Sequence, residues 1–194
     1  MSILRTLIVV GGLVTTLAAQ GVWTSWPVSQ APPDLQVAIS RADLVIVTMQ
    51  DAVLRELNDE LALGDRARAM NFFHLNVTAT IQRLARQEGI AAGRTSDRLR
   101  SPTNAPRPWA APLIRTHAGQ SARSVEGIAV DLGDRIGVLR PIAERPICAG
   151  CHGPLLAPGV KTALLDRYPA DKAVGFADGE IRGWFWVEMP KRRR

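Results

Sequence analysis

The most constraining feature of this 194-residue chain is the run Cys148-Ala149-Gly150-Cys151-His152, because Cys148 and Cys151 are its only cysteines. A C-x-x-C-H run is the attachment signature of c-type haem. Two thiols one helical turn apart can each add across one vinyl group of a porphyrin and form a thioether. The histidine that follows is then the proximal iron ligand. The sequence therefore predicts one covalently attached haem c, held by Cys148, Cys151 and His152.

Three other uses of the cysteines remain open at this point. A structural disulfide would explain the two thiols but not the adjacent histidine. A thioredoxin-like redox pair is expected at the start of a helix, early in a βαβ unit. A structural zinc site takes four protein ligands, and the sequence holds no second Cys/His pair. Haem attachment accounts for the whole motif, provided that the chain reaches an oxidising compartment where such haem is assembled.

The N-terminus indicates that compartment. Arg5 is followed by an uncharged stretch, residues 6–26, that is long enough to span a bilayer as a helix. Trp23 and Trp26 would lie at the far interface, where tryptophans collect. We expect an uncleaved transmembrane anchor in residues 1–26, with a cleaved secretory signal as the alternative. Both readings place the rest of the chain outside the cytoplasm, at the inner membrane and facing the periplasm.

The remaining sequence divides into a proline-rich linker, residues 27–33, a haem domain, residues 34–190, and a basic tail, residues 191–194. The formal net charge is +6, from 24 basic and 18 acidic residues, and four of the basic residues form the tail. The body is therefore nearly neutral, and no nucleic-acid-binding motif is present. The tail suits an anionic lipid surface or an acidic protein better than a nucleic acid.

Two segments have the apolar periodicity of helices, residues 34–63 and 66–87. Gly64 and Asp65 separate them, which leaves either a helical hairpin or one long kinked rod. Three prolines then predict an irregular loop over residues 94–109.

The pattern after this loop is typical of strands. Residues 126–132 and 135–142 flank Gly133-Asp134, a suitable two-residue hairpin turn. Residues 109–114 and 183–188 are predicted as further strands. Helices followed by an antiparallel sheet give an α+β fold.

The chain also resembles a family of single-haem c-type domains, found as sensor regions of bacterial signalling proteins and as a free-standing cyanobacterial cytochrome. The resemblance rests on three blocks: Arg94-Thr95-Ser96 through Asn104-Ala105-Pro106 to Trp109, Leu139-Arg140-Pro141-Ile142 before the cysteine motif, and Tyr168-Pro169-Ala170-Asp171 through Gly183. It implies a PAS-like antiparallel sheet with long N-terminal helices.

The same resemblance implies the distal iron ligand. Members of the family can place an axial cysteine on the helix before the R-T-S block, and that position falls on His74 here. Both cysteines are needed for the thioethers, so the resemblance implies bis-histidine ligation by His152 and His74. Met70, one turn earlier, and a five-coordinate iron are the alternatives, and His117 is expected at the surface or against a propionate.

Arg94 and Arg100 are candidates for pairing with the haem propionates, because guanidinium groups suit carboxylates. The alternative is that they brace the proline-rich loop by bonding backbone carbonyls. Asp171 is expected to be a turn or helix-cap residue.

These features predict a membrane-anchored periplasmic monohaem cytochrome c that transfers electrons between redox partner proteins, and not an enzyme. It could be a subunit of a larger respiratory or photosynthetic membrane complex. The alternative is a haem-based redox or gas sensor that signals through a partner, as the relatives in signalling proteins suggest.

Overall fold

The computed structural model describes residues 23–191, without the side chains of residues 72–75. The helices and strands follow one another in this order: β1 (Ser25–Pro27), η1 (Val28–Gln30), η2 (Pro33–Leu35), α1 (Gln36–Ala62), α2 (Arg66–Gln87), β2 (Ala91–Thr95), η3 (Pro102–Asn104), α3 (Ala111–Thr116), β3 (Ile128–Asp131), β4 (Arg135–Ala143), α4 (Pro146–His152), α5 (Val160–Arg167) and β5 (Ile181–Pro190). The α+β class predicted from the sequence is confirmed, with a long N-terminal helical pair and an antiparallel sheet.

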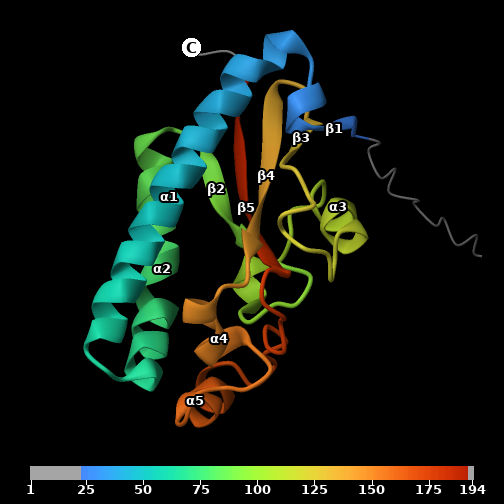
Figure 1. Cartoon of the computed structure of the whole chain (residues 1–194). Coiled ribbons are helices and arrows are strands. Elements are labelled where there is room, and N and C mark those ends of the chain that lie inside the picture. The colour runs from blue at the N-terminus through green and yellow to red at the C-terminus, as the bar shows by residue number, and fades with distance from the viewer. Residues whose placement is uncertain (1–22, 192–194) are drawn as a thin grey trace, which may run out of the picture.

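Helices α1 and α2 form a hairpin and not one rod (Figure 1). Gly64 allows the sharp turn because its φ of 82° lies in the left-handed region that other residues avoid. Asp65 then caps α2, since its carboxylate accepts hydrogen bonds from the backbone N–H groups of Ala67 and Arg68 at 2.8 and 3.0 Å. The break that the sequence shows at this point is therefore a complete turn with its own helix cap.

Five antiparallel strands form one sheet in the order β1-β3-β4-β5-β2. The predicted hairpin is present, with β3 and β4 joined at Gly133, whose φ is 91°. The Asp131 carboxylate accepts a hydrogen bond from the Gly133 N–H at 2.8 Å and closes that turn. Strand β5 lies between β4 and β2, so the C-terminal strand pairs with two strands distant in sequence.

The sheet has an apolar layer on each face. The α1–α2 hairpin covers one face and α3 lies over the other (Figure 1). Alternate residues of β4 serve the two layers, because successive side chains of a strand point to opposite faces. Val138 packs beneath the helices, and Leu139 packs with Trp109 and Trp184 on the α3 side. Helices α4 and α5 lie at one end of the sheet, beside the α1–α2 turn (Figure 1).

Two sequence predictions in the middle of the chain are wrong. Residues 109–114 do not form a strand, because Ala111–Thr116 is the helix α3. Pro112 lies in its first turn, where no backbone N–H is needed for helical hydrogen bonding, and a strand interior would not tolerate it. Residues 94 and 95 are not part of a loop, because β2 extends over Ala91–Thr95 and pairs with β5.

The segment before α1 packs onto the domain. Strand β1 pairs with β3 at the edge of the sheet, and Val28 and Ala31 are buried in the layer beneath α1. The residues predicted as a linker therefore lie against the domain as 3-10 turns. Within residues 23–191, no helix is long and apolar enough to cross a membrane. Most of the predicted anchor, residues 1–22, lies outside the described residues, so that part stays a prediction. Its predicted end is wrong, because Ser25 and Trp26 pair with β3 as part of β1 and not with a membrane interface.

Candidate functional site

The C-x-x-C-H motif forms α4. Pro146 begins the helix, and Cys148 and Cys151 follow one turn apart with both thiols free. Gly150, between the cysteines, faces the neighbouring α2, where a Cβ atom would lie 2.8 Å from Nη1 at the flexible end of the Arg66 side chain.

His152, the last residue of α4, is held in one tautomer. Its Nδ1 lies 2.8 Å from the carbonyl oxygen of Ala173, which can only accept, so Nδ1 carries the proton and Nε2 carries the lone pair. Burial lowers the pKa of His152 well below its usual range, and the positive charges of Arg182 and Arg100 lower it further. A neutral imidazole with an unprotonated Nε2 is the form that ligates a metal, and its second nitrogen is fixed as in many metal sites. Nη1 of Arg100 lies 3.5 Å from this Nε2, so the guanidinium would have to move aside for an iron.

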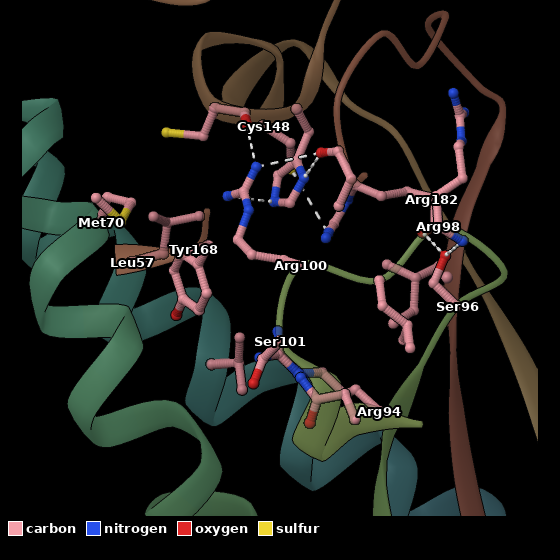
Figure 2. Close-up of a pocket in the computed structure, with 18 of the residues that line it drawn as sticks. Leu57, Met70, Arg94, Ser96, Arg98, Arg100, Ser101, Cys148, Tyr168 and Arg182 are labelled. Carbon is pink, nitrogen blue, oxygen red and sulfur yellow. Dashed lines mark hydrogen bonds between the residues drawn. The ribbon is translucent and has the colours of Figure 1, made fainter. Parts of the chain in front are cut away.

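Both cysteines and His152 line a cavity of about 180 Å³ at this end of the sheet, which is partly open to solvent. Figure 2 shows its walls, with Leu57 and Met70 from the helical hairpin, Tyr168 after α5, and Arg94, Arg98 and Arg100 on and after β2. The helical side is apolar apart from Arg66, and the opposite side is rich in arginine.

Arg100 braces the surrounding loops. Its Nη2 donates to the carbonyl oxygens of Cys151 at 2.6 Å and Ala173 at 3.2 Å, and its Nε donates to Asp171 at 3.2 Å. Asp171 also accepts a hydrogen bond from the N–H of Ala173 at 2.8 Å, as expected of a turn residue. Arg100 thus matches the bracing alternative and fixes the carbonyl that orients His152.

Arg94 differs from Arg100 in lacking such contacts among the described residues. It extends from β2 into the cavity, and the described residues offer its guanidinium no hydrogen bond or ion pair. Burial lowers the pKa of Arg94 to about 10, and repulsion by Arg182 adds to the effect. A partly buried cation without a counter-charge is costly, which makes Arg94 the natural partner of a carboxylate on a bound molecule.

These features can be set beside known proteins. A sequence model of the Tll0287-like family matches residues 30–190. The chain belongs to the Tll0287-like family. Among solved structures, the crystal structure of the cyanobacterial haem protein Tll0287 is similar, with a TM-score of 0.54 and 18% identity over 84% of this chain and 99% of that chain. No curated protein sequence matches. The family resemblance drawn from the three sequence blocks is thereby confirmed.

Not every predicted ligand can be placed in this Tll0287-like domain. His74 lies within α2, but its side chain is outside the described residues, so its role as distal ligand stays a prediction. Met70, the alternative, is 5% exposed and lines the cavity. His117 ends α3, where its ring lies 5.9 Å from that of Trp184, and it is not among the described residues that line the cavity. The propionate contact that was one alternative for His117 therefore has no support in this cavity.

Sequence reasoning missed two residues beside α4. Arg182, on β5, places Nη2 4.0 Å from the sulfur of Cys148 and Nε 3.1 Å from a carboxylate oxygen of Glu144. Arg182 stood in the third resemblance block without an assigned role. No sequence pattern pointed to Glu144, because only the pairing of β4 with β5 brings it to the site.

Proposed function

We propose that this protein binds one haem c covalently and carries single electrons. The observation that supports it best is the state of α4, where two free thiols and a neutral His152 with its Nε2 unprotonated line one cavity. Each thiol would add across one vinyl group, so that a carbon–sulfur bond forms and the thiol hydrogen goes to the neighbouring carbon. His152 would supply the proximal nitrogen to the iron.

The rest of the cavity fits such a group. The apolar wall of α1 suits the porphyrin plane, and Arg94 offers a cation without a partner to one propionate. When bound, the haem supplies the one-electron redox chemistry. The chain would orient His152 through Ala173, exclude water with the leucines of α1, and balance the propionate charge with Arg94.

We assign the distal position to His74, as the family resemblance implies, which gives bis-histidine ligation and a potential below that of a His/Met cytochrome. In the purified protein, His74→Ala should abolish the six-coordinate low-spin spectrum, whereas Met70→Leu should retain it. The reverse result would make Met70 the ligand. A low-spin spectrum that survives in both variants would exclude both residues.

The covalent haem is tested by the absorption spectrum of the denatured protein in alkaline pyridine. The wild type should give the spectrum of haem with both vinyl groups saturated. Cys148→Ser and Cys151→Ser should each shift it toward a single thioether, and the double variant should lose covalent haem. His117→Ala serves as the control that leaves attachment unchanged. A wild-type protein without covalent haem would refute the proposal.

A carbon monoxide binding test distinguishes electron transfer from sensing. If the protein transfers electrons, its reduced form should not bind carbon monoxide, because both axial positions of the iron are filled. Rapid binding would favour the sensor function instead. Neither role makes the protein an enzyme.

We further propose that the uncharged stretch before β1 anchors the protein in the inner membrane, with the haem domain in the periplasm beside redox partner proteins. The uncharged N-terminal stretch and the oxidising conditions that haem attachment requires support this location. Protease added to spheroplasts should remove the domain, and intact cells should protect it. Gentle detergent extraction followed by affinity purification should recover the electron donor or acceptor, as separate proteins or as a membrane complex.

A further inference from the structure

Glu144 is the most unusual side chain near the cavity that the proposed function does not use. It follows β4 directly and is only 2% exposed. Its backbone is fixed on both sides, because its N–H donates to the Glu180 carbonyl at 2.8 Å and its carbonyl accepts from the Gly179 N–H at 3.0 Å. Within the described part of the chain, neither carboxyl oxygen has a hydrogen-bond partner. Buried polar groups are nearly always hydrogen-bonded, so this carboxyl needs an explanation.

The nearest charge is that of Arg182. Its Nε lies 3.1 Å from one oxygen of Glu144, at an angle that makes an ion pair but no hydrogen bond. Its Nη2 lies 4.0 Å from the sulfur of Cys148. One guanidinium therefore separates the buried carboxyl from the residue that would carry the haem (Figure 2 shows Cys148 and Arg182). A change of charge on the haem side would act on Glu144 through a short, poorly hydrated path.

Several charged and titratable groups surround the Glu144 carboxyl and set its pKa. The charged and titratable groups that face Glu144 are Arg182 on β5, Asp178 and Glu180 before β5, Arg100 after β2, and the thiol of Cys151 on α4. Burial raises the pKa of Glu144 to about 7 against the attraction of Arg182, and Asp178 raises it further. The carboxyl is thus close to half-protonated at neutral pH, where a small change in potential shifts its charge most.

We propose that Glu144 is a proton-binding site coupled to the oxidation state of the haem. This inference rests on the proposed function. When a partner protein delivers one electron, the added negative charge favours protonation, and Glu144 takes one proton from solvent to form a new O–H bond. On oxidation the electron leaves to the acceptor, that O–H bond breaks, and the proton returns to solvent. The protein then transfers a proton together with each electron near neutral pH.

The experiment is a spectroelectrochemical titration of the purified full chain between pH 5.5 and 8.5. The pyridine spectrum of the denatured protein is recorded first for each variant. The wild-type midpoint potential should fall with rising pH by up to 59 mV per tenfold change in proton activity, the one-electron value. Glu144→Gln, nearly isosteric, should remove this slope around pH 7. Glu88→Gln, an exposed carboxyl at the far end of α2, should retain it.

A second measurement detects the carboxyl proton directly and can be started on the wild type alone. The reduced-minus-oxidised infrared spectrum of the wild type should contain the C=O stretch of a protonated carboxyl, and Glu144→Gln should lack it. If covalent haem is absent, the proposed function fails and this inference fails with it. If haem is attached but the wild-type potential is independent of pH, or the slope persists in Glu144→Gln, only the proton site is refuted.

Discussion

Arg94 gives the sharpest test of how this chain prepares its cavity for a bound carboxylate. Burial lowers its pKa to about 10, and the described residues offer it no counter-charge. This lowering corresponds to about 3 kcal/mol, at about 1.4 kcal/mol per pKa unit. Because the cation is present at every pH below about 10, the whole cost acts at neutral pH and would be relieved only as the pH rises above about 10.

The perturbation is Arg94→Met, which removes the charge and keeps most of the side-chain length. In a haem-free background made by Cys148→Ser with Cys151→Ser, we expect the free energy of unfolding to rise. The cavity is partly open to solvent, so the gain should be about 1–3 kcal/mol. In the haem-loaded protein the same change removes the partner of a propionate, and the free energy of unfolding should fall by about 1–2 kcal/mol.

The assay is urea denaturation in both backgrounds, compared only where the m-values agree. Arg86→Met, an exposed arginine in the last turn of α2, controls for the general effect of placing methionine on the surface. The midpoint potential of the loaded Arg94→Met protein should also fall, because a nearby cation favours the reduced haem. If Arg94→Met changes stability equally in both backgrounds, Arg94 does not pair with the haem and the reasoning is wrong.

Three further predictions concern single contacts. Trp109→Phe should cost about 1–3 kcal/mol in thermal unfolding, because it removes the indole N–H that donates to buried Glu188 at 2.7 Å. Gly93→Ala should cost a similar amount, because the new Cβ would lie 2.7 Å from the rigid ring of Trp186, and adding Trp186→Leu should recover part of it. Glu144, with a folded-state pKa of about 7 against 4.5 when unfolded, holds its proton longer in the folded state. The free energy of unfolding should therefore fall by up to about 3 kcal/mol between pH 4.5 and 7 and stay low above it, whereas Glu144→Gln should be flat over that range.

The elements that sequence reasoning found are those with local signals. The periodicity of α1 and α2, the Gly133 turn between β3 and β4, and the spacing of α4 are all set by neighbours in the chain. The helix α3 was missed because residues 109–114 were predicted as a strand, although Pro112 suits the first turn of a helix.

The roles within the site depend on contacts between distant segments. Arg94 and Arg100 are indistinguishable in sequence, yet Asp171 and the carbonyl of Ala173 engage Arg100 alone. Glu144 meets Arg182 only because β4 and β5 pair in a register with a shift at Ala143. No local pattern could have placed that pair beside Cys148.

The charges that line the cavity connect the roles of Arg94 and Arg100 with the proton site at Glu144. Three of its arginines each lie within 3.2 Å of a carboxylate, in the pairs Arg98–Glu180, Arg100–Asp171 and Arg182–Glu144. Arg94 and Arg66 also line the cavity without such a pair among the described residues, and a carboxylate from outside the chain beside Arg94 would help to complete the balance. Protonation of Glu144 would uncover a second cation, Arg182, directly beside Cys148. That cation would stabilise one additional negative charge on a group attached there, which is the condition for a proton to accompany an electron.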